Sequence, residues 1–179
     1  MYPYCGLLTG SASTILGTSN TLLTLYYYND EGSPSNVYKQ HYQSGSVNAD
    51  NCDEVIITRN FEGIITVSNR IHHNSGTGNT TIATRYDYDH LNRPLRTYIK
   101  INNDSEVKLA ENSYNEIVQL KRRSLHNGLQ NSKYAYNERG WVKNSISDQF
   151  SFQLKYNNGA TPQYNGDISE QLWGKLNTR

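Results

Sequence analysis

The sequence predicts an all-β protein whose consecutive antiparallel β-hairpins form a curved open sheet. Three observations lead to this prediction: a short turn motif recurs, the segments between its copies alternate apolar and polar residues, and tyrosine is abundant. The chain of 179 residues contains 15 Tyr but only 3 Phe and 2 Trp. A tyrosine buries its ring while its hydroxyl keeps a polar partner or water. Such side chains suit a thin sheet better than a thick helical core.

The recurring motif is an aromatic residue followed by Asn or Asp, two variable residues and usually Gly. Its five copies begin at Tyr28, Arg59, Tyr88, Tyr114 and Tyr136, and degenerate copies follow at 156–159 and 164–166. Asn or Asp in the second position can accept a hydrogen bond from the backbone two residues on. Gly in the fifth position can take the left-handed conformation that closes a short hairpin with a bulge. The motif therefore predicts a reverse turn at each copy.

The motif identifies the residues expected to form the turns and the aromatic residues expected to pack between repeats. The predicted turn residues are Asn29, Gly32, Asn60, Gly63, Asp89, Asn92, Asn115, Asn137 and Gly140. Asn92 replaces Gly, and Asn is the next best residue at positive φ. Val118 also replaces Gly, but a β-branched side chain resists this conformation, so the fourth turn is either of another type or strained. The rings predicted to pack between repeats are Tyr28, Tyr88, Tyr114, Tyr136 and Trp141.

The segments between the turns read as strands and polar connectors. Phe150, Phe152 and Leu154 alternate with polar residues, which is typical of a half-buried strand. Polar connectors such as 73–80 and 102–105 predict surface tips. Residues 104–113 have some helix propensity, yet the hairpin rhythm passes through them and we expect a strand. We expect the whole chain, 1–179, to be a single repeat region. It would consist of a lead-in strand region over 1–24, motif hairpins over 25–156 and a degenerate repeat over 157–179.

Several segments resemble the tyrosine-aspartate (YD) core of RHS-repeat proteins. The clearest is 86–95, Tyr-Asp-Tyr-Asp-His-Leu-Asn-Arg-Pro-Leu, in which the family usually has Gly where Asn92 stands. Segments 114–120 and 134–141 are similar to successive repeats, and 6–11, 26–32 and 164–173 fit RHS-repeat proteins of the Bacteroidetes type. The resemblance implies a hairpin ribbon that spirals into a hollow shell, as in the cocoon of insecticidal toxin complexes, the YD shell of teneurins and bacterial polymorphic toxins.

The resemblance also implies a function, a set of partners and a location. The function is that of a non-catalytic structural module in a shell that encloses or presents a C-terminal cargo. The partners are the flanking RHS repeats of the full-length chain and an enclosed C-terminal toxin, and the location is extracellular or at the cell surface. The first residues lack the basic and apolar regions of a secretory signal, so either the protein is intracellular or the chain lacks its true beginning. The resemblance to repeat proteins favours the second alternative.

Charge and composition argue against several other classes of function. The 17 basic and 16 acidic residues are interspersed, so no nucleic-acid surface is predicted. No segment approaches the ~20 apolar residues of a membrane-spanning helix. Without a nucleophile–base set or a phosphate-binding loop, we expect neither enzymatic activity nor a cofactor. Cys5 and Cys52 are expected to be two unpaired thiols, with a single bridge as the alternative.

Few residues are candidates for metal or acid–base chemistry. His72 and His73 are adjacent on a predicted strand and point to opposite faces, so they cannot both reach one ion, and no metal site is predicted. Two pairs of carboxylates share a strand face because they stand two residues apart: Asp87 with Asp89, and Asp104 with Glu106. We interpret Asp89 as a turn former and Asp87 as an exposed residue.

The alternative function is a cell-surface adhesion or carbohydrate-binding module. Tyr26, Tyr27 and Tyr28, together with Tyr38 and Tyr42, could form an aromatic platform for a surface glycan. The competing interpretation is cross-strand ring pairing, which stabilises a sheet by ~0.2–1 kcal/mol per pair. We favour the structural interpretation because tyrosines recur at the hairpin turns, whereas a binding site has no need to recur in each repeat.

Overall fold

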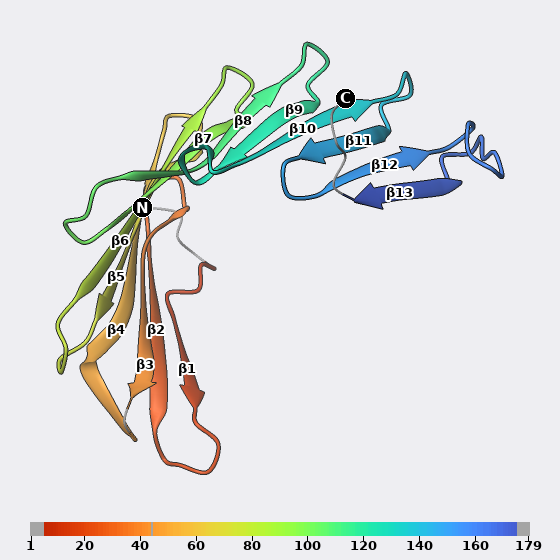
Figure 1. Ribbon diagram of the computed structural model, residues 1–179. Coiled ribbons are helices and arrows are strands. Elements are labelled where there is room, and N and C mark those ends of the chain that lie inside the picture. Colours follow the sequence, from red (N-terminus) through yellow and green to blue (C-terminus); the bar gives the residue numbers. More distant parts are fainter. Residues whose placement is uncertain (1–5, 44, 175–179) are drawn as a thin grey trace. The chain divides into compact units, whose positions relative to one another are not determined.

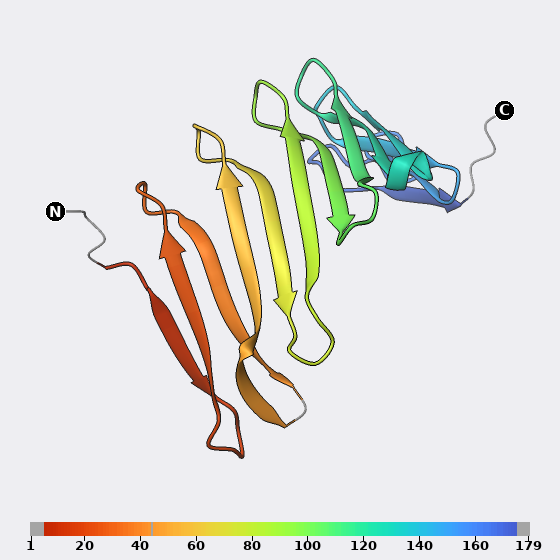
Figure 2. The same ribbon diagram turned by 90° about the vertical axis from the view of Figure 1, so that its left-hand side faces the viewer.

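The computed structural model describes residues 6–43 and 45–174. Thirteen antiparallel strands form one open sheet, and their order in the sheet is their order in the chain (Figures 1 and 2). The predicted all-β class of consecutive hairpins is therefore confirmed. Helix within the described ranges is confined to a 3-10 turn, η1 (His126–Gly128). The chain divides into two compact units, Met1–Asp87 with Tyr98–Glu106, and Tyr88–Thr97 with Val107–Arg179.

The first unit contains the longer strands. They are β1 (Gly10–Thr14), β2 (Thr21–Tyr28), β3 (Pro34–Gln43), β4 (Ser46–Arg59), β5 (Ile65–His73) and most of β6 (Thr80–Tyr88). β7 (Pro94–Ile101) contributes residues to both units. Figure 2 shows β1 to β6 side by side in this order.

The second unit contains shorter strands. They are β8 (Val107–Tyr114), β9 (Leu120–Leu125), β10 (Gln130–Tyr136), β11 (Val142–Ser147), β12 (Ser151–Lys155) and β13 (Glu170–Gly174). β8 confirms the expectation of a strand, and not a helix, over most of residues 104–113. The five motif copies begin 31, 29, 26 and 22 residues apart, and this spacing decreases because the intervening strands become shorter.

The register of the first unit assigns alternate residues to two faces of the sheet. Leu25 pairs with Tyr38, Tyr38 with Glu54 and Glu54 with Ile71, which places all four on one face. The neighbouring residues in each strand lie on the opposite face, because successive side chains of a strand alternate. The pattern explains why β2 alternates strictly between exposed and half-buried residues.

Each unit is a single layer of sheet without a thick hydrophobic core. Among the described residues, Tyr156 is the one buried hydrophobic side chain. The accessible surface is 12502 Å², whereas a compact protein of this mass exposes about 8,800 Å². Stability therefore depends on the hydrogen-bond ladder and on cross-strand side-chain contacts. Within the same described ranges, no helical segment has the length and apolar character needed to cross a lipid bilayer.

Candidate functional site

The recurring motif forms the same tight turn at five of the hairpins. These turns join β2 to β3, β4 to β5, β6 to β7, β8 to β9 and β10 to β11. In the first turn the N–H of Asn29 donates to Ser33 O at 2.9 Å, and the N–H of Gly32 donates to Asn29 O at 3.0 Å. The corresponding bonds of the other four turns measure 2.9–3.1 Å. The connections at the other ends of the strands have varied lengths and conformations.

The second motif position carries Asn or Asp because its side chain closes the turn. Its Oδ1 atom accepts the N–H of the residue four positions later, which joins the turn to the start of the following strand. These acceptors and donors are Asn29 with Ser33 (2.8 Å), Asn60 with Ile64 (2.9 Å), Asp89 with Arg93 (3.0 Å), Asn115 with Gln119 (2.8 Å) and Asn137 with Trp141 (2.9 Å). A short side chain with an oxygen in this place is what such turns require.

The fifth motif position is left-handed in every copy. The φ angles are 75° at Gly32, 81° at Gly63, 60° at Asn92, 73° at Val118 and 83° at Gly140. The fourth turn, with Val118, has the same hydrogen bonds as the others. Of the two alternatives that the sequence left open, the turn is therefore of the common type, and Val118 is strained within it.

The side chain at the first motif position ties a hairpin to the one before it in several copies. The hydroxyl of Tyr28 donates to Leu8 O at 2.7 Å. Tyr114 donates to Pro94 O (3.1 Å), Tyr136 to Leu120 O (2.9 Å) and Tyr156 to Val142 O (2.8 Å). Each acceptor is the main-chain carbonyl two residues after a left-handed residue. We call these bonds the tethers, since they join successive hairpins outside the strand ladder.

Arg59 forms a tether of the same kind although it is not aromatic. Its Nη1 atom donates to Pro34 O at 2.6 Å, and Pro34 lies two residues after the left-handed Gly32. In the sequence, Arg59 departs from the motif because it is not aromatic. What it shares with tyrosine is a long side chain that ends in a hydrogen-bond donor. Sequence reasoning missed the tethers, and the signal for them was a donor at this position in every copy.

The third turn adds an ion pair to the tether. Arg93 Nε donates to Asp89 Oδ2 at 2.6 Å, and the guanidinium of Arg93 lies 4.3 Å from the ring centre of Tyr114 in the next repeat. The hydrogen bond from Arg93 is the main cause that lowers the pKa of Asp89 from 3.8 to about 2. In the fifth copy, burial raises the pKa of the Tyr136 hydroxyl. Tyr88 occupies the tether position of the third copy, at the end of β6.

The tyrosines considered for glycan binding do not form one surface. Tyr26 and Tyr28 lie on one face of β2, and Tyr27 lies on the other because strand residues alternate. The ring of Tyr27 meets Tyr38 edge-on, with centres 5.7 Å apart. The hydroxyl of Tyr28 is used in a tether. Because side chains alternate between the two faces of a strand, this separation could have been predicted from the sequence.

Two neighbouring histidines each lie within hydrogen-bonding distance of a carboxylate. His72 Nδ1 lies 2.7 Å from Asp53 Oδ1, whereas His73 Nε2 lies 3.1 Å from Glu54 Oε2. Burial raises the pKa of Asp53, but hydrogen bonds from Arg70 and His72 outweigh it and keep that pKa below its usual value. Over the described residues no group of three or more His, Cys, Asp or Glu could hold a metal ion.

The remaining candidates are distributed over several strands. Asp87 and Glu106 both contact Arg85, at 2.6 Å and 2.8 Å, while Asp89 belongs to a turn. Asp104 lies in the connector after β7 and donates its N–H to Ile101 O. Cys52 is a half-buried residue of β4, and burial raises the pKa of its thiol. Cys5, its partner in the alternative disulfide, lies outside the described residues.

Fold and turns together define a class of protein: an open antiparallel meander of repeated, tethered hairpins. Among solved structures, the chain is similar to one in the crystal structure of TcdB2-TccC3-Cdc42, with a TM-score of 0.59 and 13% identity. The alignment covers 75% of this chain and 7% of that one, so this chain spans a small part of the other's length.

A second similarity is too weak to support an argument about the fold. A porin-like protein from Bacteroides uniformis ATCC 8492 aligns with a TM-score of 0.22 and 8% identity, over 92% of this chain and 93% of that chain. No protein-family model matches the sequence. No curated protein matches it either.

Proposed function

We propose that the chain is a segment of an RHS/YD-type shell, a non-catalytic wall of β-hairpins that encloses or presents a C-terminal cargo. The observation that carries the proposal is the tether, which joins successive hairpins in the same way at five positions. A connection that repeats in this manner can be extended by adding hairpins, as a wall requires. The fold likeness to a small part of a much longer chain supports the same conclusion.

The mechanism is mechanical and steric. Each hairpin pairs with its neighbours, and the continuous layer keeps proteases and bulk solvent away from what it encloses. The single-layer architecture favours this role, because stability is distributed along the sheet rather than concentrated in one core. The partners would be the flanking repeats of the full-length chain and the enclosed C-terminal segment, a toxin by resemblance, in an extracellular or cell-surface location.

The outer edges of β1 and β13 are where flanking hairpins would pair. Among the described strands, each of these two has one neighbour. The N–H of Tyr26 donates to Thr9 O, so Thr9, Ser11 and Ser13 direct their main-chain groups toward β2. Ala12 therefore directs its N–H away from β2. An exposed row of such groups is a template for pairing with another chain.

Edge pairing can be tested by size-exclusion chromatography with light scattering. We expect the isolated chain to associate as its concentration rises, and Ala12→Pro to reduce this association because proline removes an outward N–H. Ser11→Pro is the matched control, since it removes an N–H that faces β2 and should lower the melting temperature instead. A stable monomer at all concentrations, or association that Ala12→Pro leaves unchanged, would contradict the proposed edge pairing.

The enclosure itself can be tested in the full reading frame that encodes this chain. The proposal requires further hairpins in that frame and a C-terminal segment that resists limited proteolysis while the hairpins are folded. The segment should become cleavable at the denaturant concentration that unfolds the sheet. A frame without further hairpins, or a segment cleaved as fast as a free peptide under native conditions, would refute the shell.

A further inference from the structure

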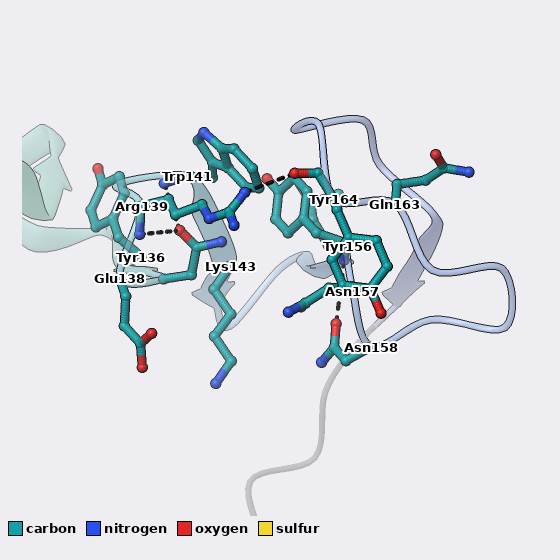
Figure 3. A pocket seen from close by; sticks show the side chains of 12 residues that line it. Tyr136, Glu138, Arg139, Trp141, Lys143, Tyr156, Asn157, Asn158, Gln163 and Tyr164 are labelled. Atoms are coloured by element: carbon teal, nitrogen blue, oxygen red, sulfur yellow. Dashed lines mark hydrogen bonds between the residues drawn. The ribbon is translucent and has the colours of Figure 1, made fainter.

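The connection between β12 and β13 departs from the repeated turn. It runs over residues 156–169, far longer than the other turns at this end of the sheet, and long loops of this kind are commonly functional. Together with the turn between β10 and β11 it borders a cavity of about 340 Å³ (Figure 3). Small-molecule sites start at roughly 300 Å³, so the space suits a small ligand. The other described hairpins have shorter turns at this end, so the cavity is separate from the repeated architecture.

The walls of the cavity are held in place by contacts within the second unit. Arg139 Nη1 donates to Tyr164 O at 2.7 Å, and its guanidinium lies 5.2 Å from the ring centre of Trp141. The ring of Tyr156 is 8% exposed, lies 5.0 Å from the Trp141 ring centre and is tethered to Val142. These contacts fix the turn and the long connection against each other. A preformed site avoids much of the entropy cost of ordering on binding.

Several side chains at the rim remain available for a ligand. Figure 3 shows Glu138 and Lys143 on one side, and Asn157 and Tyr164 on the other. In the part of the chain that the structure describes, the side chains of Glu138, Lys143 and Asn157 have no hydrogen-bond or ion-pair partner. Tyr164 is 67% exposed although its main-chain carbonyl is fixed by Arg139. The rim therefore offers a carboxylate, an ammonium, an aromatic ring and side-chain amides, among them those of Asn157 and Gln163.

We propose that this cavity binds a sugar residue of a neutral oligosaccharide. Each sugar hydroxyl both donates and accepts hydrogen bonds, which matches a rim that contains donors and acceptors together. The C–H face of a pyranose ring is apolar and can pack on the ring of Tyr164. The opposite charges of Glu138 and Lys143 offset each other, so neither sign of ligand charge gains much from the pair. A neutral polyol can donate to the Glu138 carboxylate and accept from the Lys143 ammonium. Arg139 is already committed to Tyr164 O and the Trp141 ring.

The chain offers an internal probe for this binding. Trp141 and Trp173 are its two tryptophans, and Trp173 is 72% exposed on β13. A Trp173→Phe background leaves Trp141, beside the cavity, as the sole tryptophan. The probe ligands are neutral glucan, mannan, galactan and β-1,4-linked N-acetylglucosamine oligosaccharides, first printed as an array and then titrated in solution. We expect at least one of them to bind and to change the emission of Trp141.

Two substitutions and a control locate the site. Tyr164→Ala and Asn157→Ala should each weaken the bound oligosaccharide about tenfold or more, which is ~1.4 kcal/mol of binding free energy. Tyr27→Ala, which removes a 52% exposed ring of the first unit, should leave the affinity unchanged, and circular dichroism checks that each variant is folded. No binding by any of the four classes would overturn the proposal. Binding that survives both Tyr164→Ala and Asn157→Ala, or that is lost in folded Tyr27→Ala, would also overturn it.

Discussion

Replacing Val118 by glycine should stabilise the protein, although the change removes a hydrophobic side chain. Val118 has φ 73° in a turn whose other copies use Gly or Asn. Holding a residue in such a conformation costs about 1–3 kcal/mol, and the β-branched side chain places Val in the upper part of that range. Two opposing effects have to be subtracted from this gain.

The first opposing effect is the backbone entropy that glycine loses on folding, about 0.5–1 kcal/mol. The second is the lost burial of the valine side chain, and because Val118 is 52% exposed this loss is roughly half of a ~1.5 kcal/mol burial. The net expectation for Val118→Gly is a gain of about 1 kcal/mol. For a chain of this length the gain corresponds to a rise in Tm of about 2–4 °C in differential scanning calorimetry.

Two variants control this experiment. Ile117→Gly makes the same kind of change one residue earlier, at a residue that is 70% exposed and not left-handed, so it should lower Tm. Gly63→Val introduces the strain into the second turn, where an added Cβ would meet no atom within 4 Å, so its cost is that of the backbone alone. It should lower the stability by about 1–2 kcal/mol. The backbone strain at Val118 would be refuted by two results together. These are a Tm of Val118→Gly at or below that of the natural chain, and an unchanged Tm of Gly63→Val.

Three further predictions concern the tethers and the third turn. Tyr136→Phe removes the hydroxyl that donates to Leu120 O. It should lower the free energy of unfolding, measured with urea, by about 0.5–1.5 kcal/mol. An unchanged free energy of unfolding would contradict the tether. Arg59→Met keeps the length but not the donor to Pro34 O, and should lower Tm, whereas Arg59→Lys should lower it less. The folded-state pKa of Asp89 is depressed from 3.8 to about 2, so its contribution to stability is present above pH 4 and lost as the pH falls toward 2. Asp89→Asn, which keeps the turn acceptor, should show a smaller loss of Tm over this range, and identical pH profiles would contradict the assignment.

Much of the fold could be predicted because its signals are local. An Asn or Asp three residues before a left-handed Gly or Asn is visible in the sequence, and it marks the bends between strands. The strand at β8 followed from the rhythm of these bends and not from the propensity of its own residues. The type of the fourth turn could not be predicted, since local preference disfavours Val118 and the neighbouring strands decide its conformation.

The tethers and the cavity were beyond sequence reasoning for different physical reasons. A tether ends on a main-chain carbonyl, which every residue has, so the accepting positions share no residue type. The cavity depends on how a long connection folds back onto Trp141. The degenerate motif copies at 156–159 and 164–166 do not specify the path of that connection. Tyr26 to Tyr28 show the opposite case, since strand alternation places Tyr27 on the other face, and the platform hypothesis did not use this signal.

Because the acceptor of each tether belongs to the backbone, the residue that supplies it is free to change. The acceptors are the main-chain carbonyls of residues of different types: Leu8, Pro34, Pro94, Leu120 and Val142. The tether then constrains one long donor per copy and places no demand on the side chain at the accepting position. Units joined in this way can be duplicated, shortened or exchanged without coordinated change at two positions, and such a protein can alter its length and surface chemistry quickly during evolution.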